Sequence, residues 1–115
     1  ARGHGHMTRQ TLPTRRPNLT VTTAWEGHEI LVTVGFDPAT GEPMEVFANA
    51  AKGGAMAATL ADASVLVSIA LQHGVAPDAL AKSLGRVPTF TGSGMGEGPA
   101  SPVGAVLEVV RGCLA

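Results

Sequence analysis

The sequence predicts an α+β domain in which a three-stranded antiparallel meander precedes three helices packed on one face of the sheet (β-β-β-α-α-α). Two observations lead to this prediction. Before residue 50, three short runs alternate apolar and polar residues, as half-buried strands do. After residue 54, longer apolar segments lie between residues that typically begin and end helices. Strands followed by helices favour a sheet whose helices cover one face.

The three predicted strands cover residues 19–25, 29–36 and 43–49. Each has one apolar face, made by Leu19, Val21, Thr23 and Trp25, by Ile30, Val32, Val34 and Phe36, and by Met44, Val46 and Ala48. Glu26-Gly27-His28 and Asp37-Pro-Ala-Thr-Gly41 are typical turn sequences between strands. Turns this short predict antiparallel neighbours.

The longest predicted helix covers residues 55–73, and Gly74 is placed as its stop signal. Apolar residues nearly surround this helix and leave only a thin polar stripe at Ser64, Ser68 and Gln72. A helix that is apolar on nearly all sides is buried on most of them. In so short a chain, this requires the sheet on one side and other helices or a second subunit on the other. We therefore expect a homo-oligomer, most simply a homodimer.

The remaining chain predicts two more helices and a connection. Pro77 opens one helix, which runs to Gly85, and Ser101-Pro102 precedes another at residues 103–114. Residues 88–100, with two prolines and four glycines, predict a loop. We interpret residues 1–6 as a remnant of the expression vector, residues 7–17 as a mobile basic lead-in, and residues 18–115 as a single domain.

Composition excludes several classes of protein. The 115 residues are 44% hydrophobic and only 15% charged, with a formal net charge of −1. A nucleic-acid-binding protein normally has a basic excess, and one cysteine makes neither an internal disulfide nor a cysteine-rich zinc site. No apolar run reaches about 18 residues, so no membrane-spanning helix is expected. We expect a cytoplasmic domain with no metal, cofactor, nucleic-acid or membrane partner, and the low charge suggests that a partner covers part of the surface.

One turn is a candidate ligand site. Lys52, Gly53 and Gly54 lead directly into the long helix. Glycines let backbone N–H groups approach a ligand, a helix N-terminus favours an anion, and the lysine adds a positive charge. The spacing of a full phosphate-binding loop is missing, so a tight strand-to-helix turn is the competing interpretation.

Three other features have structural interpretations beside functional ones. The glycines of residues 91–98 resemble a nucleotide fingerprint, but no strand immediately precedes them, which favours a flexible connection. Residues 72–85 resemble a DNA-binding helix-turn-helix, but Pro88 and the glycines after it interrupt the place of a recognition helix. His73, at a helix end, is typical of a side chain that bonds to the last carbonyls, and Cys113 has no base beside it in sequence. No catalytic residue is assigned.

Several motifs together resemble one known family. They are Arg16-Pro-Asn-Leu19, Ile30-Leu-Val-Thr-Val-Gly-Phe36, Glu45-Val-Phe-Ala-Asn49, Lys52-Gly53-Gly54 and Ser68-Ile-Ala-Leu-Gln-His-Gly-Val75. The chain is similar to the TSCPD domain, the C-terminal module of adenosylcobalamin-dependent (class II) ribonucleotide reductases, which also occurs as small stand-alone proteins. The resemblance covers about two-thirds of the chain.

The sequence departs from the motif that names the family. Where that motif reads Thr-Ser-Cys-Pro-Asp, this chain has Ala100-Ser101-Pro102-Val103, without the cysteine or the aspartate. Any redox or metal role of that cysteine is therefore not implied here. The reductases' catalytic barrel is absent from the sequence. The resemblance implies a non-catalytic, ribonucleotide-reductase-like accessory domain that self-associates or docks on a larger protein; the alternative is a small-ligand or nucleotide-phosphate sensor that uses the Lys52 turn.

Overall fold

The computed structural model describes residues 17–91 and 94–113, and the fold that it shows is α+β. The elements are, in order, β1 (Asn18–Trp25), β2 (His28–Phe36), β3 (Pro43–Ala50), α1 (Gly54–Gln72), α2 (Pro77–Ser83), β4 (Arg86–Thr91), β5 (Gly94–Pro99) and α3 (Pro102–Gly112). The predicted meander and the three predicted helices are confirmed. The proposed vector remnant and all of the lead-in but Pro17 lie outside the described residues.

The main sheet has the order β1-β2-β3, with both pairs antiparallel. Thr20 lies opposite Thr33, and Val34 lies opposite Val46. This register puts the predicted apolar residues of all three strands on one face. That face forms the core with the inner sides of α1 and α3, through Ile30, Val32, Val34, Val46, Ala48, Ala50, Leu60, Leu71, Val106 and Val110.

The turns and helix ends follow the local signals in the sequence. Gly27 has a φ of 79°, which glycine adopts without the steric cost of a Cβ, and it closes the turn between β1 and β2. Gly74 has a φ of 92° directly after α1. Ser101 caps α3, since its Oγ accepts a hydrogen bond from the Gly104 N–H at 3.1 Å.

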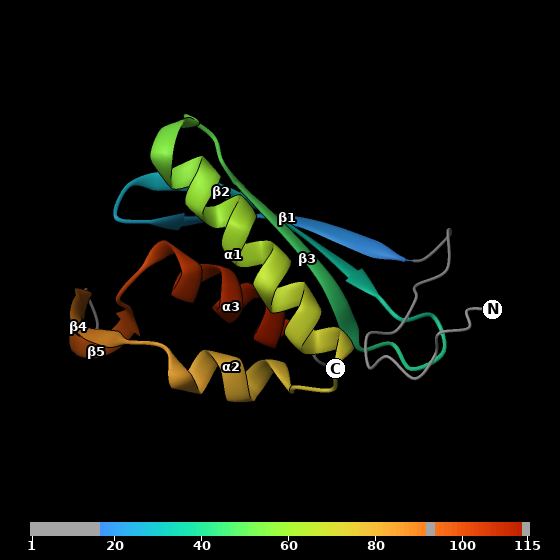
Figure 1. Ribbon diagram of the computed structural model, residues 1–115. Coiled ribbons are helices and arrows are strands. Elements are labelled where there is room, and N and C mark those ends of the chain that lie inside the picture. The colour runs from blue at the N-terminus through green and yellow to red at the C-terminus, as the bar shows by residue number, and fades with distance from the viewer. Residues whose placement is uncertain (1–16, 92–93, 114–115) are drawn as a thin grey trace.

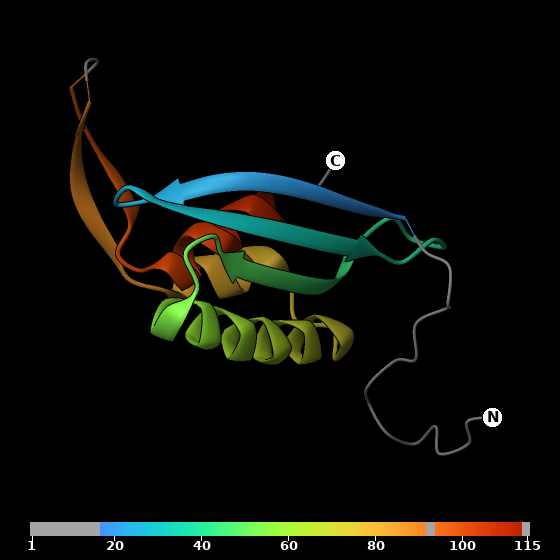
Figure 2. The ribbon, with the colours of Figure 1, turned by 90° about the horizontal axis from the view of Figure 1, so that it is seen from above.

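Helices α2 and α3 lie on one side of the sheet, whereas α1 lies beside its β3 edge, so the prediction that all three helices pack on one face holds only for α2 and α3 (Figure 1 and Figure 2). Helix α3 packs against the core face, α2 packs outside α3, and α1 runs beside β3. The opposite face of the sheet carries no helix in the described part of the chain, and Leu31 and Phe47 are exposed on it.

The predicted loop at residues 88–100 is wrong. Residues 86–91 and 94–99 form an antiparallel strand pair, the β4–β5 hairpin, in which Phe90 pairs with Met95. The glycines that suggested a loop instead permit close packing: a Cβ at position 98 would lie 3.0 Å from Cγ2 of Thr89. Because this hairpin is not part of the main sheet, Pro88 removes no hydrogen bond from a central strand.

Candidate functional site

Helix α1 lies along the edge of β3, in the position that a fourth strand would take (Figure 2). In an antiparallel edge strand, alternate residues direct their N–H and C=O groups away from the sheet. The Ala51 N–H bonds to the Glu29 carbonyl at 3.0 Å, so the odd-numbered residues of this strand face β2. Met44, Val46 and Ala48 therefore direct their backbone groups toward α1.

The polar stripe of α1 satisfies four of these six backbone groups. The hydrogen bonds are Ala48 N–H to Ser64 Oγ (3.0 Å), Val46 N–H to Ser68 Oγ (2.9 Å), Ser68 Oγ–H to the Val46 carbonyl (3.1 Å) and Gln72 Nε2–H to the Met44 carbonyl (3.0 Å). Four helical residues rise about 6.0 Å and two strand residues about 6.6 Å, so the two repeats stay in step. The stripe thus replaces a neighbouring strand.

Because the polar stripe faces the sheet, the opposite side of α1 is apolar and exposed. Val65 is 55% exposed and Leu66 is 69% exposed, whereas Ser64 and Ser68 are buried. Asp62 is the only Asp, Glu, Lys or Arg between positions 53 and 76. We call Val65, Leu66 and the exposed small residues Ala55 and Ala58 the α1 outer surface.

Among the described residues, α1 is also long and apolar enough to cross a membrane, with a mean hydropathy of 1.7. This match is by length and composition alone, because Ser64, Ser68 and Gln72 interrupt the apolar run without lowering its average hydropathy much. In this structure α1 belongs to the domain: Leu60 and Leu71 are buried in the core.

A second apolar surface lies on the β4–β5 hairpin, which we call the arm. The arm projects from the body of the domain (Figure 2). Phe90 is 77% exposed and Met95 is 76% exposed, and the two are cross-strand partners. A two-stranded hairpin alone is only marginally stable in water, so its base must be held by the rest of the fold.

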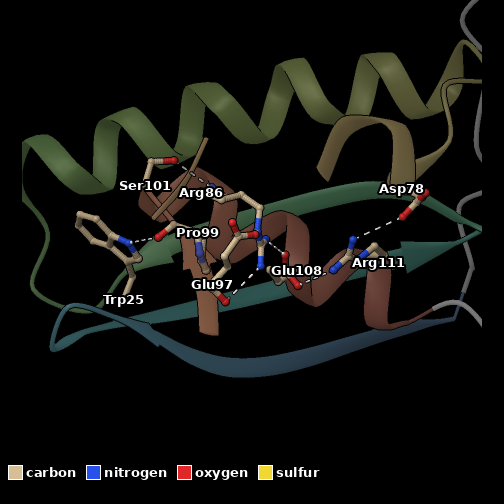
Figure 3. A network of polar contacts seen from close by, with 9 residues as sticks. Trp25, Asp78, Arg86, Glu97, Pro99, Ser101, Glu108 and Arg111 are labelled. Atoms are coloured by element: carbon tan, nitrogen blue, oxygen red, sulfur yellow. Dashed lines mark hydrogen bonds and ion pairs between the residues drawn. The ribbon is translucent and has the colours of Figure 1, made fainter. Parts of the chain in front are cut away.

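Polar contacts hold the base of the arm (Figure 3). Trp25 Nε1–H donates to the Pro99 carbonyl at 3.1 Å, which joins the arm to the end of β1. Arg86 forms an ion pair with Glu108 of α3 at 2.6 Å and a second with Glu97 at 3.5 Å. The arm therefore leaves the domain in a fixed direction.

The same network continues into α2. Glu108 also pairs with Arg111 at 2.9 Å, and Arg111 reaches Asp78 at 3.4 Å. Alternating charges therefore connect the arm, α3 and α2, with roughly a third of each Arg86 and Glu108 side chain exposed. Networks of this kind stabilise more than isolated surface pairs do. In this domain the network orients the arm, α3 and α2 relative to one another.

The Lys52 turn borders a small hollow of about 120 Å³ at the start of α1. Lys52 and Gly53 line it, and the fold adds His28 and Glu29, which sequence reasoning had not connected with the turn. Gly53 has a φ of 71° and no side chain caps α1. The Gly53 N–H is already bonded to the Ala50 carbonyl at 3.0 Å, so this N–H is not free for an anion. Gly54 does not line the hollow.

The other titratable candidates lie apart from one another in the fold. His73 Nδ1 lies 2.8 Å from the Ile69 carbonyl, as predicted for a helix-end histidine. His28 stacks on Trp25 with ring centroids 6.5 Å apart. Burial raises the pKa of the Cys113 thiol, which lowers its thiolate fraction at a given pH. Among the described residues, no three His, Cys, Asp or Glu side chains are grouped as metal ligands.

The helix-turn-helix interpretation of residues 72–85 does not fit the fold. After Gly85 the chain forms strand β4, where a recognition helix would be needed. A hollow of about 310 Å³ lies between the end of α1 and the start of α2 and is lined mainly by apolar side chains such as Met44, Leu71 and Val75.

Comparison with known proteins agrees with the motifs described above. The family model described as "TSCPD domain" matches residues 7–111. The chain belongs to the TSCPD domain family. Searches of curated proteins and of solved structures gave no match. The TSCPD match thus covers the main sheet, the arm, α1, α2 and all of α3 except Gly112.

The segment at the position of the motif that names the family has a structural role in this TSCPD domain. Ser101 is the N-cap of α3 and Pro102 occupies the first helical turn. Proline fits there because its missing N–H would have no partner within the helix. The two residues of the motif that remain are therefore those that start α3.

Proposed function

We propose that this TSCPD domain is a non-catalytic, ribonucleotide-reductase-like accessory domain that acts through protein–protein contact. Its docking site is the α1 outer surface, and its partner is a second copy or a larger protein. The observation that carries this proposal is the orientation of α1, whose hydroxyl stripe is buried while Val65 and Leu66 are exposed. This orientation leaves apolar side chains on the outside of a helix, where a partner can cover them.

The energetic argument concerns the apolar area that remains in water. Complete burial of a Val or Leu side chain contributes about 1.5–3 kcal/mol. Val65 and Leu66 each keep more than half of their area exposed, so a partner that covers both gains a substantial part of that contribution. The alanines beside them permit a close approach, and Asp62 is the one charge that such a partner must leave in water.

Site-specific photo-crosslinking in cells of the native host tests this proposal. A photoreactive amino acid is placed at position 66, and matched controls carry it at positions 79 and 82, which are also exposed but lie on α2. We expect one dominant crosslinked product from position 66, and its mass identifies the partner as a second copy or a larger protein. Equal, diffuse crosslinking from all three positions would refute the proposal.

A second candidate function is supported by the hollow at the Lys52 turn. Lys52 and His28 line it beside the uncapped start of α1, an arrangement suited to a phosphate group, although Glu29 opposes an anion there. In this case the domain is a nucleotide-phosphate sensor. Nucleotides should then raise the melting temperature of the wild type but not of Lys52→Ala, whereas Lys82→Ala should keep the response. No shift with the wild type would rule this function out.

A further inference from the structure

The second edge of the main sheet, formed by β1, is open. The Phe36 N–H bonds to the Pro17 carbonyl at 2.9 Å, which places the odd-numbered residues of β1 in the ladder with β2. Asn18, Thr20, Thr22 and Ala24 therefore direct their N–H and C=O groups out of the sheet. Of the described elements, none runs along this edge (Figure 2). The contrast with β3 is clear, since α1 covers that edge.

Strand β1 lacks the features that normally keep an open edge from pairing. Its sequence, Asn-Leu-Thr-Val-Thr-Thr-Ala-Trp, has no charged residue and no proline. Proteins usually protect open edges with lysines, prolines, bulges or a covering element. Pairing with β2 is regular along the whole length of β1. An uncharged, regular edge of eight residues is suited to pairing with another strand.

The arm projects past this same edge. In Figure 2, β4 and β5 pass the Trp25 end of β1 and continue beyond the sheet on the β1 side. In Figure 1 the arm lies on the α3 side of the sheet, the side to which the core-facing residues of β1 belong. Its apolar pair, Phe90 and Met95, lies next to Thr91 and Gly94, the last described pair of the arm. A molecule that pairs with β1 would thus also meet the arm.

We propose that the molecule bound at β1 is a second copy of this chain. The two β1 strands pair antiparallel about a two-fold axis near Thr22 and form one six-stranded sheet. Each arm then lies against the other protomer. The contact is isologous, as in most homodimers. This inference goes beyond the proposed docking on α1, because it uses a different surface and leaves both α1 outer surfaces free.

A second copy fits better than an unrelated strand because the two-fold axis also places the arm. Antiparallel pairing brings the Trp25 end of one strand beside the Leu19 end of the other. Leu19 is 46% exposed and belongs to the core face of β1. The arm, which is fixed to Trp25 through the Pro99 carbonyl, therefore passes the exposed Leu19 of the other protomer.

The size of the contact suits a stable dimer. β1, with eight residues, and the two arm strands, with six each, offer at most twenty residues per protomer to this contact. Standard interfaces take about 20–30 residues from each partner. Like charges do not meet at the axis, since β1 carries none, and the charged residues of the arm, Arg86 and Glu97, are at its base.

Molecular mass in solution tests this proposal. Sedimentation equilibrium of the wild type should give twice the chain mass of 11.6 kDa. The double variant Phe90→Ser/Met95→Ser should give the single-chain mass with an unchanged far-UV circular dichroism spectrum, because both side chains are exposed. The matched control Val65→Ser/Leu66→Ser, on the α1 outer surface, should remain a dimer.

A strand variant and amide exchange give independent readouts. Thr22→Pro removes an outward N–H that the ladder with β2 does not use, so it should also yield monomers. In the wild-type dimer, the amides of Thr20, Thr22 and Ala24 should exchange at least about tenfold more slowly than in the arm variant. If Thr22→Pro does not fold, the arm variant and the amide exchange decide.

Two results would overturn the proposal. One is a wild type that sediments as a monomer at all concentrations reached. The other is a dimer that survives the arm variant but dissociates in Val65→Ser/Leu66→Ser. The second result would place self-association on α1 and so support the proposed function while refuting pairing at β1. A crosslinked larger partner at position 66 together with a monomeric wild type would likewise separate the two proposals.

Discussion

The Ser68 hydroxyl and the Val46 backbone hydrogen-bond to each other in both directions. Ser68 Oγ accepts from the Val46 N–H at 2.9 Å and donates to the Val46 carbonyl at 3.1 Å. A neighbouring strand would offer Val46 the same donor and acceptor. This pair explains how a helix covers a strand edge, and why the apolar side of that helix is left outside.

Removal of this hydroxyl should destabilise the domain. In Ser68→Ala, the N–H and C=O of Val46 lose their partner in a buried position. A buried polar group without a partner costs about 1–3 kcal/mol. We expect a loss of this size in the free energy of unfolding, measured by urea denaturation. Ser83→Ala is the control: the Ser83 hydroxyl bonds to the Ala79 carbonyl of its own helix and is exposed, so its loss should be below about 0.5 kcal/mol. Equal losses in the two variants would contradict the account.

Two glycines of α3 should respond in opposite ways to a methyl group. In Gly104→Ala, the new Cβ would lie 2.8 Å from Cβ of Pro99, at the junction of arm and helix. Overpacking of this kind costs about 1–3 kcal/mol. In Gly112→Ala nothing lies within 4 Å of the new methyl group, and alanine favours the helix by up to about 1 kcal/mol. Thermal unfolding should therefore show a lower melting temperature for the first variant and an equal or higher one for the second. The reverse order would show that Pro99 does not pack on α3.

The ion pair of Arg86 and Glu108 should couple the arm to α3. A double-mutant cycle with Arg86→Gln and Glu108→Gln should give a coupling energy of up to about 1 kcal/mol, since both side chains are about one-third exposed. High salt should reduce this coupling, because the pair is partly solvated. A coupling energy of zero at low salt would mean that other contacts orient the arm.

The Cys113 thiol should react slowly in the folded protein. Burial raises its pKa, so at mildly alkaline pH less thiolate is present than in the unfolded chain. Alkylation by iodoacetamide should be slower in buffer than in urea at the same pH. The folded state holds the thiol proton to a higher pH than the unfolded chain does. The stability that the Cys113 thiol contributes is therefore fully present below the ordinary thiol pKa, and it is lost as the pH rises through the higher pKa of the folded state. Cys113→Ser should remove that part of the pH dependence; an identical alkaline profile would contradict it.

The strands were predictable because alternation reports directly which residues face the core, as Val32 and Val46 show. The orientation of α1 was not predicted, since an apolar helix with a thin polar stripe usually turns that stripe to water. The signal was present: hydroxyl and amide side chains recur every four residues at Ser64, Ser68 and Gln72. This repeat covers a strand edge only when an edge strand lies opposite the helix, and the position of that strand is set by the tertiary structure.

The arm was missed for another reason. Glycine density at residues 92–98 is the ordinary mark of a loop, and only the contact with Thr89 shows why glycine is needed at position 98. The Lys52 turn was located correctly, but periodicity and spacing do not show that the turn between β1 and β2 brings His28 and Glu29 beside it. The cytoplasmic location and the dimer stay predictions.

The orientation of α1 is the central claim, and thiol labelling tests it most directly. In a Cys113→Ser background, Leu66→Cys and Ser68→Cys are each treated with a small maleimide under native conditions. The account predicts rapid labelling at position 66 and labelling at least about tenfold slower at position 68, where the reagent must wait for the helix to leave the sheet. Faster labelling at position 68 than at position 66 would contradict it.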